Sequence, residues 1–94
     1  MKHFILAKLK DAGTRESLKG PVEELFRETL AIPGIHDVTV KTCCVDRANR
    51  YDLMIVIDMD RTALEEYDAC EPHRKWKENY GSLLQDKAIF DSED

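Results

Sequence analysis

Apolar residues fall into faces with a two-residue period along three stretches of the chain, and a short stretch near its end is predicted as a fourth strand. Successive side chains of a β-strand point to opposite faces of a sheet, so this period is typical of strands. The first and third stretches are apolar on both sides, which is typical of strands that are covered on both faces. The four predicted strands are residues 2–10, 35–45, 51–60 and 87–91.

Two other stretches carry apolar residues three and four positions apart, which is the spacing of one helical face. The first helix is expected to begin at Pro21, because proline is tolerated at the first helical position. Gly20 should then separate this helix from a short helical turn over residues 14–18, and a kink at Gly20 and Pro21 within one helix stays open as the alternative. The second helical region covers residues 61–84 and is expected to break at Pro72, because proline does not continue a helix.

The predicted elements follow the order β-α-β-β-α-β. This is the split βαβ pattern of a ferredoxin-like sandwich, an α+β fold with an antiparallel sheet and helices on one of its faces. The 94 residues contain no visible repeat or linker, so we expect a single domain over residues 1–94.

The strands carry more apolar side chains than one helix-covered sheet face should need. Six positions of the first and third predicted strands are not explained by the helix side alone: His3, Ile5, Ala7, Leu9, Leu53 and Ile55. A contiguous apolar face on a small chain predicts an interface. We therefore expect a homodimer in which a second copy packs sheet to sheet.

Charge and composition narrow the range of partners. The 14 Lys and Arg against 19 Asp and Glu give a net charge of −5, which argues against nucleic acid because phosphate binding needs clustered cations. The longest apolar run, residues 4–7, is far shorter than the roughly 20 residues that span a bilayer. Charges soon after it interrupt any signal peptide, and the three cysteines form no CxxC pair. We expect a cytoplasmic protein with reduced thiols that binds neither membrane nor nucleic acid.

His73 is the leading candidate for chemistry. It follows Pro72 at the predicted start of the last helix, where the helix dipole disfavours imidazolium and a neutral imidazole can accept a proton. The break at Pro72 is expected to fold Tyr67 back toward His73, and a phenol beside a neutral histidine is a recurring acid/base arrangement. The competing interpretation makes His73 a helix-start residue that faces water and Tyr67 an ordinary packing residue. His3 on the first strand is a third candidate, with a satisfied strand-end histidine as its alternative.

A metal site is not expected. Cys70 and His73 are three residues apart and could chelate an ion, but no second pair completes a tetrahedral site. The four glycines are isolated and form no phosphate-binding loop.

Five segments, in this order along the chain, carry a family pattern: KHFILAKLK at residues 2–10, IPGI at 32–35, YDL at 51–53, ALEEY at 63–67 with PH at 72–73, and IFD at 89–91. Together they resemble the stress-responsive A/B barrel (Dabb) proteins of the dimeric α/β-barrel superfamily. The resemblance covers essentially the whole chain and implies a ferredoxin-like subunit whose sheets pack into a dimeric α/β barrel.

The resemblance also implies roles for three residues. Most family members have no established reaction, but the branch similar to plant polyketide cyclases of the olivetolic acid cyclase type performs an aldol-type cyclisation without metal or cofactor. Carried over to this chain, His73 is the general base, Tyr67 is its hydrogen-bonding partner and His3 orients a carbonyl group. Many members read His-Pro-x-His before the last helix, whereas this chain has Cys70 where the first histidine is expected.

We therefore expect a dimer that binds a small hydrophobic or aromatic carbonyl compound, with metal-free acid/base chemistry as its enzymatic form and no cofactor. The apolar pocket is expected to be lined by Ile5, Ala7, Leu53, Ile55 and Trp76. Two alternatives stay open. One is a cofactor-free monooxygenase of the antibiotic-biosynthesis type, by analogy of fold, and fold does not fix function. The other is a stress-linked dimeric binding protein without catalysis.

Overall fold

The computed structural model describes residues 1–93 and has the predicted order of elements. The strands are β1 (Lys2–Leu9), β2 (Ile35–Thr42), β3 (Leu53–Met59) and β4 (Leu84–Ser92). The α-helices are α1 (Arg15–Arg27), α2 (Leu64–Asp68) and α3 (Glu71–Tyr80), and 3-10 turns cover Ala12–Thr14, Glu28–Ala31, Arg61–Ala63 and Gly81–Leu83.

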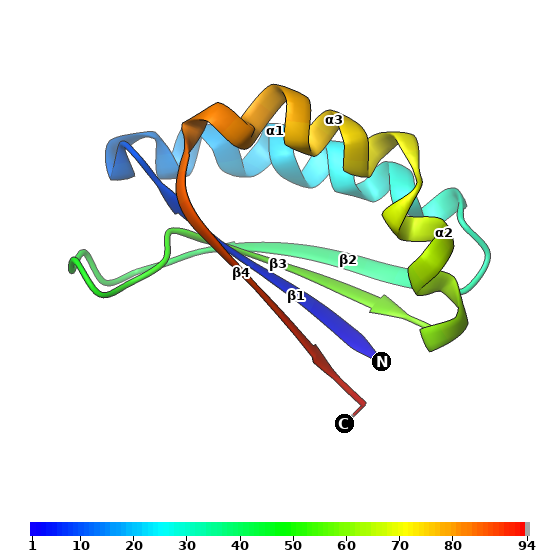
Figure 1. The fold of residues 1–94 in the computed structure, drawn as a ribbon. Helices are drawn as coiled ribbons and strands as arrows, with labels where there is room; N and C mark the ends of the chain where they lie inside the picture. The colour runs from blue at the N-terminus through cyan, green and yellow to red at the C-terminus, as the bar shows by residue number, and fades with distance from the viewer. Residues whose placement is uncertain (94) are drawn as a thin grey trace.

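The four strands form one antiparallel sheet in the order β2-β3-β1-β4, with β1 and β3 in the centre. The helices lie together on one side of this sheet, and its other side is open (Figure 1). This arrangement is the predicted ferredoxin-like α+β fold. None of the helices within residues 1–93 is long and apolar enough to cross a membrane.

The sheet face predicted to carry the excess of apolar side chains was wrong. His3, Ile5, Ala7 and Leu9 alternate along β1 with exposed or half-buried residues, and all four are buried within a single chain. Leu53 and Ile55 of β3 are buried in the same layer. These six residues point to the helix side, where they pack against the apolar stripes of α1 and α3, so they need no second copy.

An excess of apolar side chains is present on the opposite face of the sheet, which no helix covers. Phe4 and Leu6 pair across the strands with Val56 and Met54, and all four are only half-buried in the single chain. Phe90 of β4 continues this row beside Phe4, with ring centroids 6.1 Å apart and 63% of its surface exposed. The residues Phe4, Leu6, Met54, Val56 and Phe90 are called the open-face row below.

The prediction that Pro21 begins the first helix was also wrong. Helix α1 starts at Arg15 and runs through Gly20 and Pro21 without interruption. A continuous helix keeps Leu18 in the same stripe as Val22, one turn later, and both pack against the core. Burial of that longer stripe outweighs the one helical hydrogen bond that proline cannot donate.

Strand ends differ from the predicted bounds by a few residues. Strand β2 stops at Thr42 instead of residue 45, while β4 begins at Leu84 instead of residue 87. The longer β4 arises because Leu84 pairs with Leu9, and that pairing depends on a distant strand.

Candidate functional site

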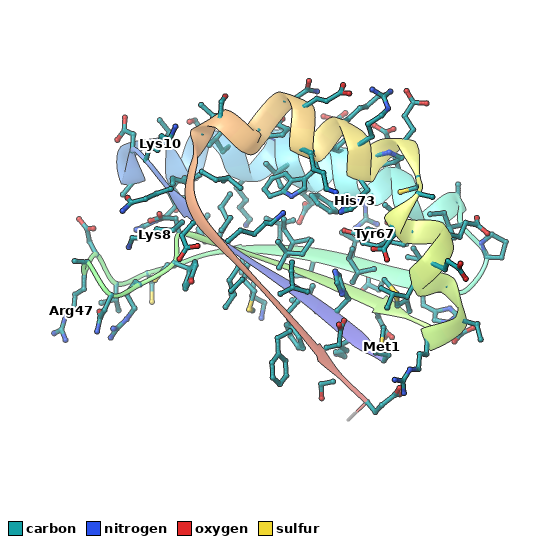
Figure 2. The ribbon with its side chains drawn as sticks, viewed as in Figure 1. Met1, Lys8, Lys10, Arg47, Tyr67 and His73 are labelled. Atoms are coloured by element: carbon teal, nitrogen blue, oxygen red, sulfur yellow. The ribbon has the colours of Figure 1, made fainter. Side chains whose placement is uncertain are left out.

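Tyr67 is the centre of the candidate site. It lies near the end of the short helix α2, and its side chain is completely buried between the first strand and the start of α3. Its ring contacts His3 edge-on, with centroids 5.2 Å apart, and His73 at 4.8 Å. The structure therefore brings together the three residues that the sequence singled out as chemical candidates. Figure 2 shows Tyr67 and His73 one above the other where α2 and α3 meet.

A tight turn between α2 and α3 sets the Tyr67–His73 contact. The amide of Cys70 donates to the carbonyl of Tyr67 at 3.1 Å, and the extended backbone of Cys70 then turns the chain into α3. Pro72 lies in the first turn of α3, where its missing N–H costs nothing. His73 directly follows this proline, and its side chain points back onto the Tyr67 ring.

His73 is held in one tautomer by the backbone. Its Nδ1 lies 3.0 Å from the carbonyl oxygen of Asp68, an acceptor, so Nδ1–H is the donor and Nε2 carries the lone pair. Burial lowers the pKa of His73 below its ordinary value, although the Asp68 carbonyl opposes that shift. The imidazole is therefore neutral near pH 7 and can accept a proton at Nε2.

His3 is held from the other side by Asp91, a residue that the sequence analysis did not identify. The two residues face each other across β1 and β4, and His3 Nδ1 lies 2.5 Å from Asp91 Oδ1. His3 is only 5% exposed, so Asp91 fixes the orientation of a buried imidazole. The contact depends on the cross-strand register that pairs positions 3 and 91. The sequence does not give this register until β1 and β4 are aligned with each other.

The Tyr67 hydroxyl forms no hydrogen bond with any residue in the described part of the chain, although it is fully buried. Burial, together with the nearby Cys70, Asp68 and Asp91, raises the pKa of Tyr67 well above its ordinary value. The group therefore stays a neutral phenol and a hydrogen-bond donor. Leaving such a group unpaired costs about 1–3 kcal/mol, and an acceptor oxygen from a bound compound would recover that energy.

The five residues expected to line the pocket belong to the core of the single chain. Ile5, Ala7, Leu53, Ile55 and Trp76 are each at most 2% exposed and pack in one apolar cluster. Together with Tyr67 they belong to the core that fills the space between the sheet and the helices. A small hollow of about 100 Å³ lies beside Asp91 and is bordered by Met1 and Arg61 at the same end of the sheet.

Cys70 lies within this neighbourhood but does not complete a metal site. Among residues 1–93, no group of three or more His, Cys, Asp or Glu side chains could hold a metal ion. Burial raises the pKa of the Cys70 thiol, so the thiol stays protonated. The polar side-chain groups proposed for chemistry are two imidazoles, one phenol and one carboxylate.

Comparison with known proteins identifies a family. The model of the stress responsive A/B barrel domain (Dabb) matches residues 1–94. No curated protein matches the sequence.

Solved structures share the fold at low sequence identity. A dimeric protein of unknown function with a ferredoxin-like fold from Bacteroides fragilis superposes with a TM-score of 0.77 and 15% identity, covering 99% of this chain and 94% of the other. A dimeric ferredoxin-like protein of unknown function from Thermobifida fusca gives a TM-score of 0.75 and 21% identity, covering 95% and 85%. A candidate antibiotic biosynthesis monooxygenase from Bacteroides thetaiotaomicron gives 0.72 and 17%, covering 100% and 88%. At these identities the similarity establishes the fold alone.

Proposed function

Because the chain belongs to the stress-responsive A/B barrel (Dabb) family, we propose that it binds a small hydrophobic or aromatic carbonyl compound beside Tyr67. The observation that carries this proposal is the fully buried Tyr67 hydroxyl, which has no hydrogen-bond partner in the described chain. A carbonyl oxygen is an acceptor of the required kind, and the surrounding core residues favour an apolar body.

We further propose that the same three residues carry metal-free acid/base chemistry of the polyketide cyclase type. His73 Nε2 removes a proton from the carbon next to the carbonyl group, and the electron pair of that C–H bond moves to the carbonyl oxygen. The Tyr67 hydroxyl donates a hydrogen bond to the resulting enolate oxygen. The enolate carbon then attacks a second carbonyl of the same molecule, and the new alkoxide takes the proton back from His73. His3, whose ring is oriented by Asp91, packs against that second carbonyl group and orients it.

We propose a homodimer formed through the open-face row. Its apolar side chains are half-buried or exposed in one chain, and a second sheet would cover them. Similar solved structures from Bacteroides fragilis and Thermobifida fusca are dimeric, which supports this proposal. We also propose a cytoplasmic location, supported by the three free cysteines.

A thermal-shift screen with phenolic and polyketide-like carbonyl compounds tests ligand binding, because a compound that binds only the folded state raises its melting temperature. We expect at least one such compound to stabilise the protein. A His73→Ala variant should keep much of this binding and lose turnover, while a matched His36→Ala variant should keep both. Turnover in His73→Ala equal to that of the wild type would rule out the general-base role.

A second candidate function is cofactor-free oxygenation. It rests on the similarity to the Bacteroides thetaiotaomicron structure described above and on the shared fold. Oxygen consumption with the stabilising compound distinguishes the two reactions, since cyclisation consumes no oxygen. Binding without conversion or oxygen uptake would favour a non-catalytic, stress-linked binding protein.

A further inference from the structure

A second cavity lies far from Tyr67 and plays no part in the proposed reaction. It has a volume of about 410 Å³ and lies where the end of β1 meets the connection between β2 and β3. Figure 2 shows Lys8, Lys10 and Arg47 at this end of the sheet, with Tyr67 and His73 at the other. The charged residues of its lining are four cations and two carboxylates: Lys8, Lys10, Arg47, Arg50, Asp46 and Asp52.

One of the two carboxylates is already neutralised inside the protein. Asp52 is 4% exposed, and its Oδ1 accepts a hydrogen bond of 2.6 Å from Arg15 Nη2. Its Oδ2 accepts a bond of 2.7 Å from the amide of Leu9. Burial alone would raise the pKa of Asp52, but these donors lower it below its ordinary value, so the group is ionised and paired. Asp46 is then the one carboxylate of the lining that opposes the four cations.

Lys8 and Lys10 lie at the end of β1, while Arg47 and Arg50 belong to the loop between β2 and β3, which is bound to the sheet. Lys8 Nζ donates to the carbonyl oxygens of Ala48 and Arg50 at 2.6 and 2.8 Å, and the amide of Arg50 donates to the Arg47 carbonyl at 3.1 Å. These bonds fix the loop against β1. By contrast, the side chains of Lys10 and Arg47 have no hydrogen bond or ion pair within residues 1–93, and both are exposed.

We propose that this cavity binds a small organic polyanion, with phosphate or carboxylate groups as its charged ends. A local excess of cations is unusual in a chain whose net charge is −5, and like charges held close together destabilise the fold unless an anion joins them. Guanidinium groups match carboxylate and phosphate oxygens in a two-point geometry. The volume falls within the roughly 300–1,000 Å³ of small-molecule sites.

Isothermal titration at low ionic strength tests the site, with pyrophosphate and citrate as the two probes. The informative variant is Lys10→Gln/Arg47→Gln, which removes the two cations without partners. Its matched control is Lys19→Gln/Lys77→Gln, which changes the net charge equally at exposed positions elsewhere. We expect the wild type and the control to bind at least one probe, and the cavity variant to bind it about tenfold or more weakly.

The two probes distinguish the sources of the charge. Tighter binding of pyrophosphate assigns a phosphate-bearing ligand, and tighter binding of citrate assigns a polycarboxylate. Amide resonances of residues 8–10 and 46–50 should shift in the wild type on addition of the bound probe, which provides a reading that does not depend on a variant. Absence of binding to both probes, or equal weakening in both double variants, would overturn the proposal.

Discussion

The ring of Tyr67 lies 4.8 Å from the ring of His73, and the two residues belong to different helices separated by a single turn. The backbone carbonyl of Asp68 fixes His73 in the tautomer that leaves Nε2 as an acceptor, while the Tyr67 hydroxyl stays protonated. A proton acceptor and a proton donor are therefore held side by side, and both lack a charge. Such a pair suits chemistry that begins by removing a proton next to a carbonyl group.

Replacement of Tyr67 by phenylalanine should leave the fold intact. The variant removes a buried hydroxyl that has no protein partner, so we expect the free energy of unfolding to stay equal or to rise by up to about 1 kcal/mol. Urea unfolding measures this change. Tyr51→Phe is the control, because the Tyr51 hydroxyl is engaged with Asp86 at 3.2 Å. A loss of stability of about 2 kcal/mol or more in Tyr67→Phe would mean that the hydroxyl has a structural partner.

Stability should depend on pH through His73. The pKa of His73 in the folded protein is lowered from its ordinary 6.5, so the unfolded chain binds this proton more readily. The contribution of the neutral imidazole is therefore fully present above about pH 6.5 and is lost as the pH falls toward the folded pKa. Melting temperatures measured from neutral to mildly acidic pH should fall in the wild type, and less steeply in His73→Gln. An unchanged slope in that variant would assign the effect to other groups, and His36→Gln serves as the control.

Asp91 should orient His3. Asp91→Asn weakens the 2.5 Å bond to His3 Nδ1, and we expect a loss of about 1 kcal/mol of stability because Asp91 is partly exposed. Nitrogen NMR of the His3 ring should show loss of the fixed Nδ1–H tautomer. The matched control is Asp60→Asn, since the His36–Asp60 pair is exposed on both sides and its loss should cost little. An unchanged His3 spectrum in Asp91→Asn would contradict the orienting role.

The open-face row should control assembly. Phe90 is 63% exposed on the edge strand β4, and a charge at this position would have to be buried against a second sheet. We expect sedimentation to give a dimer for the wild type and a monomer for Phe90→Asp. Leu83→Asp is the control, because Leu83 is also exposed but lies in the 3-10 turn after α3. A dimer that survives Phe90→Asp unchanged would place the interface elsewhere.

Local patterns predicted the order of elements and the contact between Tyr67 and His73. The contact follows from short-range chemistry, because the proline after the second helical segment forces a turn within a few residues of both side chains. The fold class follows from the spacing of the apolar residues, because that spacing distinguishes the strands from the helices and gives their order along the chain.

Long-range pairing could not be predicted in the same way. Alternation along β1 separates Ile5 from Phe4, but nothing local states which of the two faces the helices. The link from His3 to Asp91 joins residues 88 positions apart and depends on strand register. Helix α1 continues through Gly20 and Pro21 because Leu18 packs against the core. The helix propensities of Gly20 and Pro21 alone do not predict this tertiary contact.

The proposed function requires the Tyr67 hydroxyl to donate a hydrogen bond to an oxygen of a bound carbonyl compound. Isothermal titration of the most stabilising compound into wild type and Tyr67→Phe measures the contribution of this bond. We predict that the variant binds about tenfold more weakly, as expected for one lost hydrogen bond in a buried site, while Tyr51→Phe binds like the wild type. Equal affinities of Tyr67→Phe and wild type would contradict the claim.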